Sequence, residues 1–368
     1  MHSPRTIISA ILLLAAAGAS AQSGVSIYGN LDAGVSSFGN ERGGSSSKVD
    51  TGIYLPNRFG FRGSEDLGAG MRAIFLLESG FNVDDGALKR SNTLFSRAAW
   101  VGLATAGGTV TLGHMPDFMY EYLRVSSNGG AKSLYFSHPG NLDNLANQFQ
   151  IDNAIKYETP SIGGFTLGLM NGFGEQAGDA SKGRSYSLGL RYADAGLRAA
   201  AAYTVSNNRA LNLGAGLGIG KLLGQVLSAA PAAANAVYAN FNADQVKSAG
   251  ITADYRFGAV TPHALYTQVR FEAGGASATM RNADLGVDVA TGGRNTVGAS
   301  LASSRLEQRR WNQLNLIDQL ALSKRTVVYA AAAWQRASGP DVHAVIMAAA
   351  PASGQSQRVF RLGVNHMF

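Results

Sequence analysis

The segment that decides the fold is Phe360-Arg361-Leu362-Gly363-Val364-Asn365-His366-Met367-Phe368. Its apolar side chains alternate with polar or small ones, and the chain stops on an aromatic residue of the apolar parity. Successive side chains of a strand point to opposite faces, so the segment predicts a strand with one apolar face and one wet face. A soluble edge strand that happens to end in phenylalanine is the alternative.

The same period of two recurs along the chain. Valine, isoleucine, leucine and alanine hold the odd positions 25, 27, 31, 33 and 35, and polar residues hold most of the even positions between them. The windows 151–158, 185–192, 251–257 and 284–289 alternate in the same way. Each window predicts a strand that keeps one face in water. The pattern is weak between Trp311 and Trp334.

The composition excludes several classes of protein. The chain of 368 residues has 46 glycines, no cysteine and 15% charged residues, which excludes a charge-rich disordered chain and a disulfide-stapled scaffold. Beyond the N-terminal segment no apolar run reaches the ~18 residues that a spanning helix needs, which excludes a helical membrane protein. Glycine stands at about twice its usual ~7% share, which argues against a helix-rich enzyme.

The N-terminal residues predict a secretory signal peptide, residues 1–21. Arg5 supplies the positive charge, residues 7–17 form an apolar core too short to span a membrane, and Ala19-Ser20-Ala21 offers a small-x-small cleavage pattern. A buried N-terminal helix is the alternative. Removing 21 of the 368 residues leaves one domain of 347, residues 22–368. Because this domain has no cysteine, its stability must come from hydrogen-bonded ladders or from oligomerisation.

Short and long connections separate the predicted strands. The short ones include residues 66–69, 106–107, 161–163, 193–196 and 323–325, and the long ones are residues 38–55, 114–149 and 207–246. Short turns at one end and long loops at the other are typical of an all-β, transmembrane antiparallel β-barrel with periplasmic turns and external loops. A soluble sandwich would have more even loops. At ~21 residues for a membrane strand and its connection, the domain is long enough for about sixteen strands.

Five segments resemble the general, non-specific porins of Gram-negative β-proteobacteria. They are GVSIYG at 24–29, NRFGFRGSEDLG at 57–68, RAAWVGL at 97–103, GTVTLG at 108–113 and LSKRT at 322–326. The resemblance spans the whole mature chain. It implies a sixteen-stranded barrel of the outer membrane, a homotrimer surrounded by outer-membrane lipid and lipopolysaccharide, and a third external loop folded into the pore. Family members often have arginine where this chain has His114, and the alternation that ends on Phe368 resembles the assembly signal of such barrels.

Motifs of catalysis and cofactor binding are incomplete in this sequence. The run GAGLGIGK at 214–221 lacks the first glycine and the hydroxyl residue of a phosphate loop, since Ala215 and Leu222 hold those positions. The five histidines after the signal peptide have no zinc-site spacing and the chain has no cysteine, so we expect no metal site. The sequence also has no G-x-S-x-G motif, and we expect no cofactor and no enzyme activity. Basic residues are scattered singly along the predicted strands, which argues against nucleic acid as a partner.

We interpret the chain as a passive outer-membrane diffusion channel for small hydrophilic solutes and ions. A barrel of sixteen strands leaves an aqueous channel, whereas one of ~8 strands fills with side chains. Two alternatives stay open. A substrate-specific channel would carry aromatic or charged tracks along its lumen, and an adhesin or barrel enzyme would act through its external loops.

Strand register predicts where a charged pore constriction lies. Arg58 and Arg97 are each about nine or ten residues from a periplasmic turn, so at ~3.3 Å per residue they sit at similar height. Arg58 and Arg62 face the lumen by parity, because Phe59 and Phe61 on the other parity must meet lipid. Arg62 and Arg72 are expected opposite each other, lower in the barrel.

Loop three is expected to supply the acidic side of this constriction. Asp117 and Glu121 are four residues apart and share one side if the stretch is helical, and His114 lies where the loop leaves the wall. Glu78 and Asp32 are inward by parity and are expected to neutralise part of the arginine ladder. The hypothesis is a transverse field between Arg58/Arg97 and Asp117/Glu121 with a net preference for anions. The alternative is that the arginines are only paired wall residues.

Overall fold

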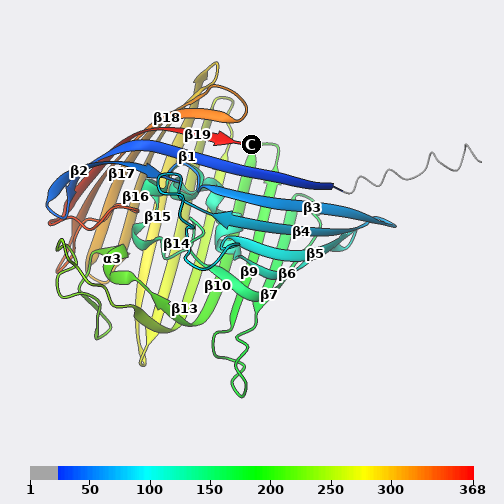
Figure 1. Ribbon diagram of the computed structural model, residues 1–368, viewed down its shortest axis with the longest axis horizontal. Coiled ribbons are helices and arrows are strands. Elements are labelled where there is room, and N and C mark those ends of the chain that lie inside the picture. Colours follow the sequence, from blue (N-terminus) through cyan, green and yellow to red (C-terminus); the bar gives the residue numbers. More distant parts are fainter. Residues whose placement is uncertain (1–23) are drawn as a thin grey trace, which may run out of the picture.

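The structure, a computed structural model, describes residues 24–368. These residues form a wall of strands around a lumen, with short helical segments in the connections (Figure 1). No helix among them is both long enough and apolar enough to cross a membrane. The signal peptide predicted for residues 1–21 lies outside the described residues.

The elements of the wall follow one another along the chain with few interruptions. The strands are β1 (Gly24–Glu41), β2 (Gly44–Thr51), β3 (Arg58–Gly68), β4 (Met71–Gly80), β5 (Ala98–Thr105), β6 (Gly108–Pro116), β7 (Gln150–Glu158), β8 (Phe165–Gly172), β9 (Ser185–Asp194), β10 (Leu197–Leu211), β13 (Phe241–Tyr255), β14 (Val260–Ala273), β15 (Ala276–Gly292), β16 (Asn295–Leu306), β17 (Arg309–Ala321), β18 (Thr326–Ser338) and β19 (Ser356–Met367). The connections hold η1 (Met119–Leu123), η2 (Arg124–Ser126), α2 (Asn128–Ala131), η3 (Leu134–Phe136), η4 (Pro139–Asn141), α3 (Leu213–Leu217), and the short hairpin β11 (Lys221–Leu222) and β12 (Gln225–Val226).

The sheet closes on itself because the first strand pairs with the last. β1 lies antiparallel to β19 on one edge (Figure 1). On its other edge β1 pairs with β2 through residues 33–41 and with β3 through residues 24–30. β2 and β3 therefore share one position, and the 17-stranded sheet is a closed barrel of sixteen positions. The predicted barrel of about sixteen antiparallel strands is confirmed.

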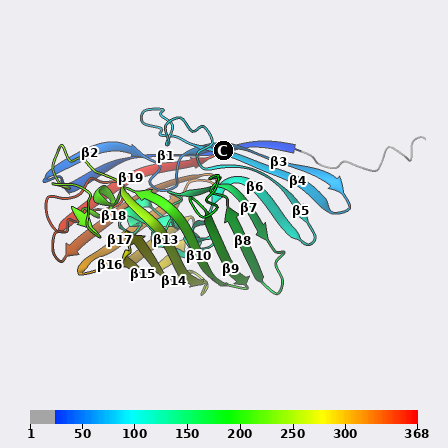
Figure 2. The same cartoon turned by 90° about the horizontal axis from the view of Figure 1, so that it is seen from below.

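Strand β9 shows why the sequence alternates. Tyr186, Leu188 and Leu190 are 41%, 44% and 43% exposed on the outer surface, whereas Ser185 and Ser187 are buried toward the lumen. The β9 neighbours β8 and β10 lie on either side of it in the wall (Figure 2). An apolar outer face and a polar inner face suit a barrel that stands in lipid, where every backbone group is paired within the wall.

Strands β17 and β18 fill the window in which the sequence pattern is weak. The inward face of β17 mixes Trp311 and Ile317 with Gln313 and Asn315, all buried. Neither parity of that strand is therefore purely polar, and β18 contains the alanine run 330–333, which has no strong preference for either face.

The prediction of a long irregular connection over residues 38–55 is wrong. β1 continues to Glu41 and returns as β2, so most of this stretch is a hairpin whose serines hide the alternation. Only the segment 52–57 leaves the wall. It turns into the lumen, where the buried Ile53 donates its backbone N–H to Asp32 Oδ2 at 2.7 Å. Pro56 in this segment has no N–H to give to a ladder, which favours the break.

The connection between β6 and β7, residues 117–149 (loop 3), folds into the lumen as the resemblance implies. Phe118 packs on Gly168 and Gly189 of two wall strands, where a Cβ would collide with its ring. On the far side of the barrel, Tyr135 joins a buried cluster of wall residues. Wall glycines thus make room for one end of the loop, and wall side chains hold the other.

Candidate functional site

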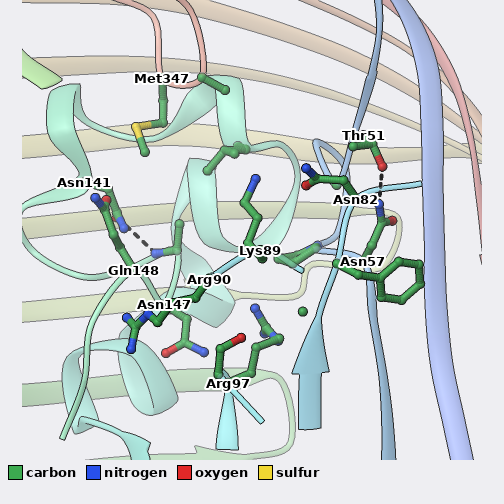
Figure 3. A pocket seen from close by; sticks show the side chains of 18 of the residues that line it. Thr51, Asn57, Asn82, Lys89, Arg90, Arg97, Asn141, Asn147, Gln148 and Met347 are labelled. Atoms are coloured by element: carbon green, nitrogen blue, oxygen red, sulfur yellow. Dashed lines mark hydrogen bonds between the residues drawn. The ribbon is translucent and has the colours of Figure 1, made fainter. Parts of the chain in front are cut away.

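A cavity of about 350 Å³ opens inside the barrel, between the inward segment 52–57, the connection 81–97, loop 3 and residues 347–348 (Figure 3). Its basic side chains all come from the connection 81–97 and are Lys89, Arg90 and Arg97. Most of its other polar side chains are carboxamides: Asn57, Asn82, Asn141, Asn147, Gln148 and Gln150. None of the described residues that line the cavity is an aspartate or a glutamate. The cavity therefore offers positive charge and N–H donors to a solute.

A narrower hollow of about 20 Å³ adjoins this cavity. Gly52, Pro56, Leu134 and Ala146 line both spaces, so the two are adjacent. The hollow adds two further guanidinium groups, from Arg58 and Arg124. We call the two spaces together the cationic passage; its basic residues are Arg58, Lys89, Arg90, Arg97 and Arg124.

One carboxylate, Glu78, is shared by the two arginines that strand register selects. Arg97 Nε donates to Glu78 Oε1 at 2.7 Å, and Arg58 Nε lies 3.5 Å from Oε2. The Tyr28 hydroxyl also donates to Oε2, at 2.8 Å. Arg58 and Arg97 thus meet at one level of the wall. Because two guanidinium groups face one carboxylate, the cluster keeps a net positive charge.

The sequence analysis misses the basic residues that loops bring to the passage. Arg90 Nη2 donates to Gln150 Oε1 at 3.2 Å, and the Arg124 guanidinium lies over the Tyr120 ring, 4.9 Å from its centroid. These contacts orient the two side chains without neutralising them. Lys89, Arg90 and Arg124 lie in connections, where no strand parity predicts a direction. In the sequence, these three basic residues lie close to the predicted residues Arg97 and Asp117. That closeness is the signal that could have identified them.

The two residues predicted for the acidic side of the constriction, Asp117 and Glu121, lie outside the lining of the cationic passage. Asp117 is buried and accepts hydrogen bonds from the Tyr120 backbone N–H at 3.1 Å and from Asn144 Nδ2 at 2.9 Å. Glu121 is paired with Lys156 of β7 at 2.8 Å. Neither carboxylate lines the cationic passage. Asp117 is held by the amide of Asn144, whereas Glu121 of η1 pairs with Lys156 and lines a separate cavity that also contains Arg191 and Arg198.

The other two arginines of the predicted ladder do not face each other. Arg62 is opposite Leu76, and Arg72 is opposite Asp66, because the hairpin turns at residues 69–70 and not over the predicted turn 66–69. Neither arginine lines the cationic passage, and both are exposed. They lie nearer the periplasmic end of the same hairpin.

His114 is also displaced from the predicted constriction. It shares the parity of Leu112, whose side chain is 51% exposed on the outer surface. Its ring Nδ1 pairs with Asp152 of β7, an outward-facing residue. The alternation of β6 therefore carries His114 away from the lumen.

Asp32 is inward, as parity predicts, but it belongs to a buried network in the wall. Its carboxylate accepts from Arg361 Nη2 at 3.1 Å and from the Tyr329 hydroxyl at 2.6 Å. The backbone N–H groups of Ile53 and Tyr54 donate to the same carboxylate. Asp32 thus holds the inward segment 52–57 in place and does not face a solute.

A buried histidine holds loop 3 against the far wall. His138 Nδ1 lies 2.7 Å from Asp143 Oδ2, and its Nε2 lies 2.8 Å from Asp284 Oδ1 of β15. Burial by itself lowers the pKa of His138, but the carboxylates of Asp284 and Asp143 outweigh burial and hold this pKa well above its ordinary value of 6.5. The charged imidazolium therefore joins a loop carboxylate to a wall carboxylate. Within residues 24–368, no group of three or more histidine, cysteine, aspartate or glutamate side chains is placed to hold a metal ion.

Proteins named as porins are among those that this chain resembles. The family model described as Gram-negative porin matches residues 9–340. An outer membrane porin protein of Bordetella pertussis is 30% identical over 56% of this chain and 61% of its own length. Matches to the major outer membrane protein P.IB of Neisseria gonorrhoeae span 53% of that protein. The outer membrane porin protein 32 of Delftia acidovorans is 27% identical over 99% of both chains.

Solved structures share the architecture of the barrel. The anion-selective porin from Comamonas acidovorans superposes with a TM-score of 0.72 at 24% identity, covering 94% of this chain and 100% of that one. OmpT of Vibrio cholerae, in a trimer form, superposes with a TM-score of 0.66 at 13% identity over 94% of this chain and 99% of that one. These two likenesses concern the fold. Together with the family model, which matches most of the sequence, they lead to one conclusion: the chain belongs to the Gram-negative porin family.

Proposed function

We propose that this outer-membrane β-barrel is a diffusion channel for small hydrophilic solutes that passes anions in preference to cations. The observation that carries the proposal is the cationic passage, which has five basic side chains and no carboxylate among the described residues of its lining. The channel performs no chemical step. Solutes cross by diffusion, and the wall decides only which of them enter.

The charge of the passage acts strongly because the passage is narrow. Low-dielectric protein on all sides focuses the field of the guanidinium groups into the water that remains. A cation must approach several positive charges there, whereas an anion exchanges part of its hydration shell for N–H donors. Glu78 weakens this field but does not cancel it, since it faces both Arg58 and Arg97.

Relatives support the same function and suggest the assembly. The structural neighbour from Comamonas acidovorans is described as anion-selective, and the Vibrio cholerae neighbour as a trimer. A homotrimer embedded in outer-membrane lipid and lipopolysaccharide is the assembly that we propose for this chain. An external apolar belt of strands such as β9 suits contact with acyl chains and with neighbouring barrels.

Planar-bilayer recording of the refolded protein tests the proposal. In a tenfold gradient of potassium chloride, the zero-current potential should have the sign expected for a channel that is more permeable to chloride than to potassium. A potential of the opposite sign would overturn the anion preference, and the absence of conductance would overturn the channel. Saturation of the current by one solute would instead identify a substrate-specific channel.

A further inference from the structure

The connection between β10 and β13, residues 212–240, is unusually apolar for a loop at the mouth of a channel. Leu213, Leu217, Ile219 and Leu222 are at most 2% exposed, although they lie between two strands and outside the wall. Large aliphatic side chains are buried to this degree only when they pack on an apolar partner. This connection therefore has a fixed seat in the molecule.

Its seat is the inner face of the wall at the outer ends of β14–β17. Phe271, Met280, Leu306 and Trp311 point inward there, are at most 1% exposed, and belong to the same buried cluster as the leucines of the connection. Farther down these strands the inward residues turn polar: Thr267, Asn282, Ser304, Gln313 and Asn315. This apolar lining would face water if the connection were elsewhere, which is unfavourable.

The same region of the rim has no long loops of its own. β14 and β15 are joined by Gly274-Gly275, and β16 and β17 by Glu307-Gln308. The connection 212–240 covers this low rim from the side (Figure 1). It is also tied to two other inward loops: Gly218 accepts a hydrogen bond from the His343 backbone N–H at 3.1 Å, and Leu142 of loop 3 belongs to the shared cluster.

We propose that residues 212–240 form a fixed cap that closes the β14–β17 side of the outer mouth. Solutes then reach the lumen only through the cationic passage, on the other side of loop 3. The cap thereby sets the size limit of the channel and keeps permeating ions close to Lys89, Arg90 and Arg97. This inference rests on the proposed channel function.

Removal of the cap is a direct test because the ends of the connection are adjacent. Leu211 and Phe241 are register partners, so an Asn-Gly turn can replace residues 212–240. The β14–β15 and β16–β17 hairpins already use two-residue turns at this end. We expect the deletion variant to show about twofold or greater single-channel conductance, faster uptake of larger neutral sugars into liposomes, and a weaker preference for chloride. Unchanged conductance and sugar uptake would overturn the cap.

Cysteine labelling tests the cap in the full-length chain, which has no cysteine of its own. Leu217→Cys places a thiol under the cap, whereas Val237→Cys places one on the same connection at a side chain that is 82% exposed. A membrane-impermeant maleimide should label Val237→Cys at least about tenfold faster than Leu217→Cys. Equal rates would overturn the docked cap. A protein that labels as expected but conducts no ions would retain the cap and refute the channel.

Discussion

At the scale of single residues, the contribution of a basic side chain to the positive field of the passage depends on whether a carboxylate is paired with it. Arg58 and Arg97 share the carboxylate of Glu78, so their combined field is weaker than that of two free guanidinium groups. Lys89 lines the cavity with no carboxylate partner among the described ion pairs. The local excess of positive charge therefore depends on one acid as much as on several bases.

Two neutral substitutions at this cluster should move ion selectivity in opposite directions. Glu78→Gln removes the neutralising charge and should raise the chloride-to-potassium permeability ratio, by about twofold. Arg97→Gln removes a guanidinium and should lower the ratio by a similar factor of about two. The zero-current potential in a salt gradient measures both. Shifts of the same sign would show that the substitutions act by distorting the wall and not through charge.

At the scale of elements, loop 3 is positioned by ionic contacts with the wall as well as by its apolar side chains. Lys132 pairs with Asp288 of β15 at 2.9 Å, and His138 pairs with Asp284 of the same strand. Glu121 is paired with Lys156 on the opposite side. The loop crosses the lumen between these anchors, and the passage is the space that it leaves beside the inward segment 52–57.

The His138 anchor should weaken as pH rises. Because the pKa of His138 is raised in the folded state, its contribution to stability is fully present below the ordinary value of 6.5 and is lost as pH rises through the folded-state pKa. At pH 6, His138→Gln should therefore lower the free energy of unfolding by roughly 3 kcal/mol, as expected for removing one partner of a buried ion pair. Urea titration in detergent should show this difference shrinking toward alkaline pH. A difference that stays constant with pH would exclude a charged His138.

At the scale of the whole molecule, closure of the barrel depends on the contact between its two ends. The Gly29 backbone N–H donates to Phe368 O at 3.1 Å, and the Phe368 N–H donates to Gly29 O at 3.1 Å. The Phe368 ring covers Gly29, where a Cβ would collide with it. The terminal residue that the sequence analysis associates with assembly thus lies at the seam, and its role in assembly stays a prediction.

A methyl group at the seam should impair folding of the entire barrel. Gly29→Ala forces the Phe368 ring aside and should cost about 1–3 kcal/mol through overpacking. Gly24→Ala on the same strand is the matched control, because nothing lies within 4 Å of the added carbon. Electrophoresis of unheated samples should show less of the compact, folded form for Gly29→Ala only. Deletion of Phe368 should reduce the folded form further. Equal folded yields for all variants would show that the contact between Gly29 and Phe368 is not needed for assembly.

The sequence by itself determined which residues face lipid and which face the lumen. Parity is a local property of a strand, so Arg58, Glu78 and Asp32 could be placed inward without knowledge of their neighbours. The number of strands followed from the length of the chain. The resemblance of five motifs to the porin family predicted that the third loop folds inward. The sequence pattern was weakest where serines or alanines reduce the contrast between the two faces of a strand, as in residues 44–51 and 330–333. It also misplaced the turn after β3, and with it the register of Arg62 and Arg72.

Only the tertiary structure decided what fills the lumen. Loops have no periodicity, and their path depends on contacts with residues more than a hundred positions away, such as His138 with Asp284. Glu121 could pair with any base within reach, and the fold selected Lys156. The cationic passage and the cap over β14–β17 arise in the same way. Charged groups pair with, and apolar side chains pack on, the residues that closure of the barrel brings near them.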